Sequence, residues 1–352
     1  MAYVVAGEPL PQLAPLVAAL HEALERAGFR PADDENPPEL VVNVVDRERP
    51  RPFRRRSRGT FVAALHVVDE QPPDPLREGY PILVRALANV SLAYVPGVGV
   101  WFTTLERGSY LVAAGPGLAD AVVARLAPLA RSRLVIENEF RPDLEPELWD
   151  GDELTAAIAA AGRRLDALGL LPAPFPVEEL VDERDLRHIK RLYGIGGLSY
   201  GNLSARRDAT RFWMSASGVD KARLETPGRD ILLVSGYDPE QMRMILSVPP
   251  GIEPRRVSVD AIEHWKIYRD HPEVGAILHV HAWVEDVPAT EVNYPCGTEE
   301  LAQDVADLIA AEPEPARAVI GLRNHGITAT GASLDEILDR IAPRLLRQVP
   351  MT

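Results

Sequence analysis

Short apolar runs alternate with amphipathic segments along the first 135 residues. Residues 11–28 carry apolar side chains at helical spacing and end at Gly28, which predicts an amphipathic helix. The run ELVVNVV at 39–45 is β-branched and bounded by turn formers, which predicts a buried strand. The same reasoning predicts a strand at 61–68, a helix at 80–90, two strands joined by Pro96-Gly97 and a helix at 118–130. Together these elements predict an α/β or α+β domain.

Two segments rich in proline and acidic residues interrupt this pattern, at 140–153 and 170–180. Proline restricts the backbone and lacks an N–H donor, so these segments are typical of connectors. An alanine-rich helix is predicted between them at 153–168, so a boundary fits on either side of that helix. We expect two domains, residues 1–150 and residues 151–352.

The second half continues the alternation of apolar strands and amphipathic helices. The expected elements are a helix at 183–193, a Gly-rich turn at 194–201, strands within 202–234, a helix at 258–270, a strand at 274–283, a helix at 298–311, a strand at 317–323 and a helix at 333–346. This order predicts an α/β sheet covered by helices.

The composition and charge of the chain argue against several classes of partner and site. Apolar residues make up 46% and charged residues 26% of the 352 residues, which is typical of a globular protein. The net charge of −14 opposes binding to nucleic acid or anionic lipid, and no apolar run is long enough to span a membrane. We expect a cytoplasmic protein with a small-molecule substrate and neither a nucleic-acid nor a membrane partner. The single cysteine, Cys296, excludes an internal disulfide and cannot alone build a thiolate metal cage.

An arginine-rich segment at 47–58 contains seven arginines and two prolines. Such a cluster can hold phosphates. A solvated loop is favoured here, because Phe53 is the only aromatic residue available for base stacking. No binding role is predicted for this segment.

The strand predicted at 274–283 contains two histidines, His279 and His281. Side chains alternate faces along a strand, so these two imidazoles point the same way and can supply two ligands of a tetrahedral or octahedral shell for a divalent ion. One core and one exposed histidine would produce the same pattern. His325 ends another apolar strand next to Gly326, where a side chain can be directed into a cleft, and it is a candidate third ligand.

Four stretches of the second half resemble the class II aldolase/adducin family over roughly residues 180–340. They are SYGNLSAR, FWMSASGVDK, SVDAIEHWKIYRDHPEVGAILHVHA, and GTEELAQDV with LRNHGITATG. The resemblance implies that His279, His281 and His325 hold a divalent metal ion, with zinc expected first, which binds oxygens of a sugar-like substrate. Such an ion stabilises the enediolate formed beside a carbonyl.

The resemblance also assigns an acid/base role to Asp260, nineteen positions before His279. An aspartate there is closer to the ribulose-phosphate 4-epimerase branch than to the fuculose-phosphate aldolase branch. A surface N-cap is the alternative role for Asp260. The phosphate pocket of the family corresponds to five positions here. They are Gly201, Asn202, Ser217, Gly218 and Ser258. Val259 stands where the family has a second serine, and Arg255 and Arg256 are either solvated or able to restore affinity for an anion.

Two departures from the family concern the wall of the site. Only fifteen residues, 282–296, separate His281 from Gly297, and no tyrosine follows Tyr294 to act as a proton donor from a C-terminal segment. The resemblance implies assembly as a homo-oligomer. The leading hypothesis is a metal-dependent lyase or isomerase of aldolase type, acting on a small phosphorylated hydroxycarbonyl or sugar. The alternatives are a non-catalytic adducin-like binding or structural domain and a 4-epimerase-type sugar phosphate isomerase.

Overall fold

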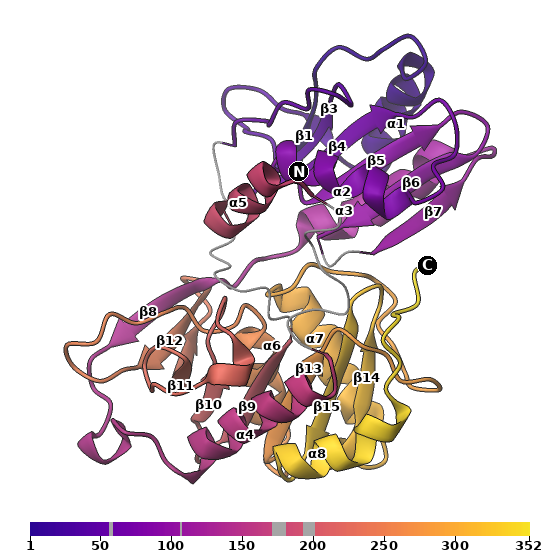
Figure 1. The fold of residues 1–352 in the computed structure, drawn as a ribbon. Coiled ribbons are helices and arrows are strands. Elements are labelled where there is room, and N and C mark those ends of the chain that lie inside the picture. Colours follow the sequence, from indigo (N-terminus) through magenta and orange to yellow (C-terminus); the bar gives the residue numbers. More distant parts are fainter. Residues whose placement is uncertain (56–58, 106–107, 171–180, 193–200) are drawn as a thin grey trace. The chain divides into compact units, whose positions relative to one another are not determined.

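The computed structural model describes residues 1–55, 59–105, 108–170, 181–192 and 201–352. These residues divide into two compact units (Figure 1). Unit 1 holds Met1–Ser132 with described residues 181–189 and 351–352, and unit 2 holds the other described residues from Arg133 to Pro350. A domain boundary at residue 150 remains a prediction, because compactness alone does not show where an independently folding part begins.

Unit 1 is built on a seven-stranded sheet with the order β2-β1-β3-β4-β5-β6-β7. The first five strands in that order are parallel, and β6 and β7 continue the sheet as antiparallel neighbours. The strands are β1 (Ala2–Ala6), β2 (Arg30–Pro31), β3 (Leu40–Val44), β4 (Phe61–Val67), β5 (Val90–Val95), β6 (Gly99–Thr104) and β7 (Ser109–Ala113). The helices are α1 (Ala14–Arg26), α2 (Pro75–Arg85), α3 (Leu118–Arg131) and α5 (Glu183–Leu192). Parallel strands need crossover connections, and α1 and α2 lie in two of them.

The apolar pattern of unit 1 predicted most of these elements, and one helix was misplaced. The helix expected at 80–90 is α2, which begins five residues earlier and ends at Arg85. The Asp74 side chain accepts a hydrogen bond from Arg77 N and so caps the start of the helix. Leu87 adopts a left-handed φ of 51°, which stops the helix before β5 begins at Val90.

His66 of β4 is fully buried in unit 1, and burial lowers the pKa of its imidazole to about 4. In the unfolded chain His66 takes up a proton below its ordinary pKa of 6.5, whereas in the folded chain it stays neutral down to about pH 4. The free energy of unfolding therefore falls as the pH drops from 6.5 towards 4. We expect unit 1 to lose about 2 kcal/mol between about pH 7.5 and about pH 5 through this residue, and His66→Leu to remove that loss. Urea unfolding with hydrogen exchange of the β3–β5 amides measures it. An equal pH dependence in both proteins would contradict this role.

Unit 2 is built on an eight-stranded sheet with the order β14-β15-β13-β9-β10-β11-β12-β8. Its neighbours are antiparallel except β12 and β8, which are parallel. The strands are β8 (Glu137–Arg141), β9 (Asn202–Arg206), β10 (Phe212–Ser215), β11 (Ile231–Asp238), β12 (Arg243–Ser247), β13 (Ala276–Val280), β14 (Val319–Leu322) and β15 (Gly326–Gly331). The α/β class expected from the sequence is confirmed in both units.

Helices cover both faces of this sheet (Figure 1). Helices α4 (Glu153–Ala167) and α8 (Leu334–Ile341) pack together against β9 and β13, while α6 (Ala261–Asp270) packs on α7 (Glu299–Ala311). Of the predicted Gly-rich turn at 194–201, residues 194–200 lie outside the described residues. None of the described helices combines the length and apolarity needed to cross a membrane.

Candidate metal centre and its carboxylates

Two histidines lie at the end of β13, the strand between β15 and β9 in the sheet of unit 2. His279 belongs to the strand and His281 follows its last residue, Val280. His325 comes from the turn between β14 and β15, where Asn324 has a left-handed φ of 57°. Gly326 lets this turn approach β13 closely, because a Cβ there would lie 2.3 Å from Val280 O.

The structure brings the three histidines together. Their nearest ligand nitrogens all lie within 4.8 Å of one another, and the ring centroids are 4.6–5.1 Å apart. The Nε2 atoms of His281 and His325 are 3.0 Å apart. Three imidazoles converging at one point are a donor set that suits zinc or a neighbouring divalent ion.

Burial of His279 and His325 favours the neutral form of these two imidazoles, which is the form that binds metal ions. His279 is fully buried and its Nδ1 donates a hydrogen bond to Ile327 O at 3.0 Å, which leaves the Nε2 lone pair for a ligand. Among the described residues, none forms a hydrogen bond with that Nε2. Burial lowers the pKa of His279, and burial with the nearby His279 lowers the pKa of His325 to about 3. A buried Nε2 of His279 without a hydrogen-bond partner among the described residues, close to two further imidazoles, fits a divalent ion.

Asp260 lies beside this cluster at the start of α6 and is 5% exposed. Its side chain makes no capping hydrogen bond, so the surface N-cap alternative is wrong for this residue. Instead Oδ2 accepts a hydrogen bond of 2.7 Å from Asn202 Nδ2, while Oδ1 has no partner among the described residues. The carboxylate is therefore held at one oxygen and available at the other.

A row of polar side chains crosses three strands under α6. His279 of β13 lies opposite Asn202 of β9 and Thr328 of β15, and directly paired residues share a face of the sheet. Asn202 binds Asp260, and Thr328 Oγ1 donates to Glu263 Oε1 at 2.6 Å. The first turn of α6 thus places one carboxyl group on each side of His279.

Glu263 and Lys221 are buried charged groups of this region that the sequence reasoning missed. Glu263 is 2% exposed, and burial together with Asp260 raises its pKa to about 8. Lys221 is also 2% exposed, and burial lowers its pKa to about 8 although Asp260 acts in the opposite direction. The three-residue spacing of Asp260 and Glu263 on one helix was the available signal for Glu263.

The five residues expected to bind phosphate fall into two groups. Gly201 and Asn202 lie against the histidine cluster: a Cβ on Gly201 would be 2.4 Å from His279 O, and the Asn202 side chain donates to Asp260. The second group begins with Ser217, whose backbone N–H donates to Arg256 O at 2.9 Å and which precedes Gly218. Ser258 faces Ser215 rather than Ser217, because its N–H donates to Ser215 O at 3.3 Å. Ser215 is thus a neighbour of the proposed pocket that the sequence did not indicate.

The comparison with protein families agrees with this fold and with the order of the motifs. Residues 187–342 match the model of the "Class II Aldolase and Adducin N-terminal domain" family. This part of the chain is a class II aldolase/adducin domain. The match covers unit 2 from β9 to α8 and leaves most of unit 1 outside it.

Curated relatives of the aldolase/adducin domain include two methylthioribulose-1-phosphate dehydratases. The protein from Klebsiella pneumoniae strain 342 is 28% identical over 167 residues, which covers 39% of this chain and 76% of the relative. The protein from Granulibacter bethesdensis is 28% identical over 213 residues, which covers 59% of this chain and 77% of the relative.

Solved structures similar to this chain include an L-fuculose 1-phosphate aldolase, with a TM-score of 0.37 and 18% identity over 55% of this chain and 82% of that one. The N-terminal class II aldolase domain of a Thermoplasma acidophilum protein has a TM-score of 0.35 and 16% identity, and the match covers 58% of this chain and 95% of that one.

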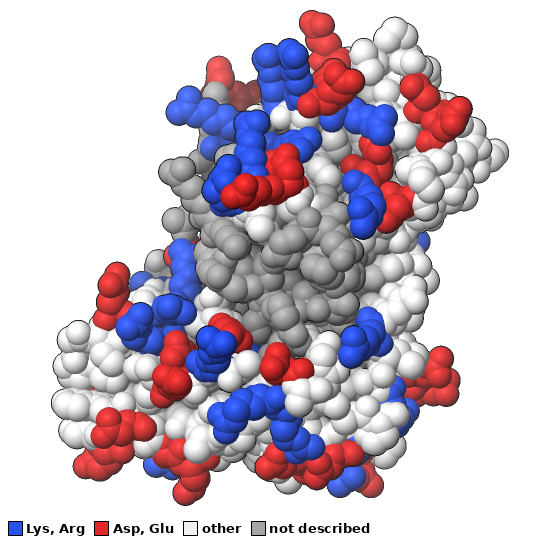
Figure 2. Space-filling view, in the orientation of Figure 1, with Lys and Arg blue, Asp and Glu red and all other residues white. Residues whose placement is uncertain are grey.

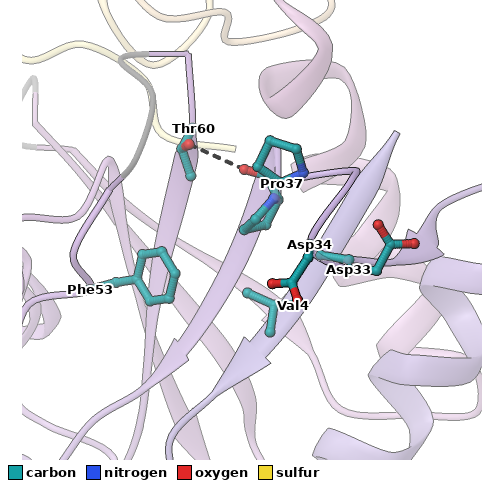
Figure 3. A pocket seen from close by; sticks show the side chains of 8 residues that line it. Val4, Asp33, Asp34, Pro37, Phe53 and Thr60 are labelled. Carbon is teal, nitrogen blue, oxygen red and sulfur yellow. Dashed lines mark hydrogen bonds between the residues drawn. The ribbon is translucent and has the colours of Figure 1, made fainter.

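Outside the aldolase/adducin domain, unit 1 has a cavity of about 430 Å³ (Figure 3). Val4 and Phe53 supply apolar walls, Asp33 and Asp34 line it, and Thr60 Oγ1 donates to Pro38 O at 3.1 Å. Nothing in the described residues identifies a ligand for this cavity.

The arginine-rich segment of unit 1 is partly bound within the protein. Arg47 pairs with Glu78, and Arg55 donates to Leu87 O and to Asn89 Oδ1. On the face drawn in Figure 2, basic and acidic side chains are interspersed in the described parts of each unit. Residues 56–58 of this segment lie outside the described residues.

Proposed function

We propose that this chain is a divalent-metal-dependent lyase of aldolase type that acts on a small phosphorylated hydroxycarbonyl compound. The convergence of His279, His281 and His325 beside the buried Asp260 is the observation that carries the proposal. The family of unit 2 supports a lyase, and the named relatives support a phosphorylated sugar as the substrate class. A non-catalytic adducin-like role is less well supported, because a purely structural domain has no need for three convergent imidazoles, two of them buried.

In this proposal each residue has a defined task. His279, His281 and His325 hold the ion, which supplies a Lewis acid for negative charge on a substrate oxygen when bound. Asp260 Oδ1 accepts the proton from the carbon next to the substrate carbonyl, and Asn202 fixes the orientation of the carboxylate through Oδ2. In a dehydration, the same proton is returned to the departing β-hydroxyl group, so that water leaves and the substrate is neither oxidised nor reduced.

The phosphate group would bind at the positions that the family pattern assigns to it. Glycine-exposed N–H groups and short hydroxyls cradle a phosphate without a lysine, and Gly201, Ser217, Gly218 and Ser258 provide such groups. Val259 has no hydroxyl where the family pattern has a serine, so we expect the phosphate to bind more weakly here than in a protein with that serine. Asn202 serves the carboxylate instead, because its amide is bound to Asp260.

Dehydration of methylthioribulose 1-phosphate is the first reaction to test, because both curated relatives carry that name. We expect the zinc-loaded protein to release a dehydrated ketone product, and activity to disappear after chelation and return when zinc is added. Fuculose 1-phosphate, assayed for retro-aldol cleavage, distinguishes a dehydratase from an aldolase, and unphosphorylated sugars serve as matched controls. A metal-loaded protein that turns over none of a panel of phosphorylated ketoses would contradict the proposal.

A further inference from the structure

Cys296, the single cysteine of the sequence, lies at the edge of the histidine cluster. Its Sγ is 3.6 Å from His325 Nε2. The neighbouring backbone is fixed on both sides, because Thr298 Oγ1 donates to Pro295 O at 2.8 Å and Val135 N donates to Gly297 O at 2.7 Å. The thiol is therefore brought to the histidines by an anchored piece of chain just before α7.

His325 Nε2 lies within hydrogen-bonding distance of two neighbouring atoms at once. This nitrogen is 3.6 Å from the Cys296 sulfur and 3.0 Å from His281 Nε2. A ring nitrogen carries either one hydrogen or one lone pair in the ring plane, so it cannot form directed hydrogen bonds with both neighbours. A single ion between the three atoms would accept a lone pair from each of them.

The two separations measured from His325 Nε2 agree with Cys296 as an additional ligand beside the three clustered histidines. Zinc–nitrogen bonds of about 2.0–2.1 Å and a zinc–sulfur bond of about 2.3 Å at tetrahedral angles place nitrogen and sulfur about 3.5 Å apart and two nitrogens about 3.3 Å apart. The observed values are 3.6 Å and 3.0 Å. The fully buried His279 adds an Nε2 that has no hydrogen-bond partner among the described residues, which is a second indication of a ligand at this place.

We propose that Cys296 is the fourth protein ligand of the ion held by His279, His281 and His325. The inference rests on the proposed metal site and deepens it. The thiol proton is released to solvent as the sulfur–metal bond forms, and no oxidant or reductant is needed. A thiolate favours zinc over magnesium or manganese. Four protein ligands also close the tetrahedral shell, so a substrate oxygen must enter as a fifth ligand or replace the sulfur.

Cobalt(II) substitution tests this proposal without any substrate. Cobalt bound to a thiolate shows a charge-transfer band in the near ultraviolet, and cobalt bound to imidazoles shows only weaker d–d bands in the visible. Because the sequence has one cysteine, a charge-transfer band can come only from Cys296. We expect the band in the full-length wild-type chain and its loss in Cys296→Ser, with the d–d bands retained.

Zinc competition with a chromophoric chelator provides the second measurement. We expect Cys296→Ser to weaken zinc binding about 10²-fold, because one of four ligands contributes about a quarter of the total binding free energy. Cys296→Ala serves as a second variant in case the serine protein folds poorly. In the wild type, zinc should slow alkylation of the thiol by iodoacetamide, whereas in His279→Ala/His281→Ala it should not.

The outcomes separate this inference from the proposed function. Visible d–d bands without a charge-transfer band, or unchanged zinc affinity in both cysteine variants, would overturn the role of Cys296 and leave the histidine site standing. Failure of the wild-type chain to bind either cobalt or zinc would overturn the histidine site and the cysteine ligand together.

Discussion

The purified protein is expected to contain about one divalent ion per chain, and the double variant His279→Ala/His281→Ala is expected to contain none. Both imidazoles come from the end of one strand, so removing them leaves His325 as the one histidine of the cluster. A zinc site gains about 10–16 kcal/mol from roughly four ligands, so losing two should weaken binding at least about 10³-fold. Elemental analysis after dialysis and chelator competition measure the two quantities.

His271→Ala is the matched control for this experiment. His271 is a buried histidine of unit 2 that lies outside the cluster, with Nδ1 3.3 Å from Glu273 Oε1. We expect this variant to keep the wild-type metal content, while urea unfolding shows whether either variant has lost its fold. Full occupancy in the folded double variant would exclude these histidines as the metal ligands.

The helices and apolar strands could be predicted because their side-chain pattern is local. Strands such as β3, β4 and β13 are continuous buried runs, and helices such as α1 and α7 repeat apolar positions at helical spacing. The strands that the sequence analysis missed are β1, β2, β7, β8, β12 and β15, and for β8 and β15 the reason is that their own residues give no strand pattern. The sequence ENEFR of β8 is polar, and the strand forms through parallel pairing with β12. The sequence GITATG of β15 reads as a turn until β13 and β14 pair with it.

The candidate site shows the same division between local and long-range information. The spacing of His279 and His281 and the strand end at His325 are visible in the sequence, and the family resemblance added the role of Asp260. Glu263 could not be assigned, because its partner Thr328 is 65 residues away and meets it only through the β13–β15 register. Cys296 was set aside as unable to form a thiolate cage alone, and its position next to His325 emerges only when the 282–296 segment is folded.

Asp260→Asn is expected to retain the metal ion and to lose turnover by about 10²–10⁴-fold, the usual contribution of a positioned acid or base. The amide has the size of the carboxyl group, and its oxygen can still accept the hydrogen bond from Asn202, so the local structure should persist. What disappears is the ability of Oδ1 to take up a proton. Steady-state rates with the phosphorylated ketose that wild type converts best, together with metal content, measure the effect.

Glu263→Gln is the matched control for that prediction, on the same helix and equally buried. Burial and the neighbouring Asp260 raise the pKa of Glu263 to about 8, so the carboxyl is mostly protonated near neutral pH and glutamine imitates it, including the acceptor for Thr328. Near neutral pH we expect a rate within about threefold of wild type, well below the contribution of an acid or base. Above pH 8, Glu263 ionises in the wild type beside Asp260 and glutamine cannot, so the two pH profiles should separate there. A Glu263→Gln protein as inactive as Asp260→Asn, or an Asp260→Asn protein as active as wild type, would show that Asp260 is not the proton-transfer group.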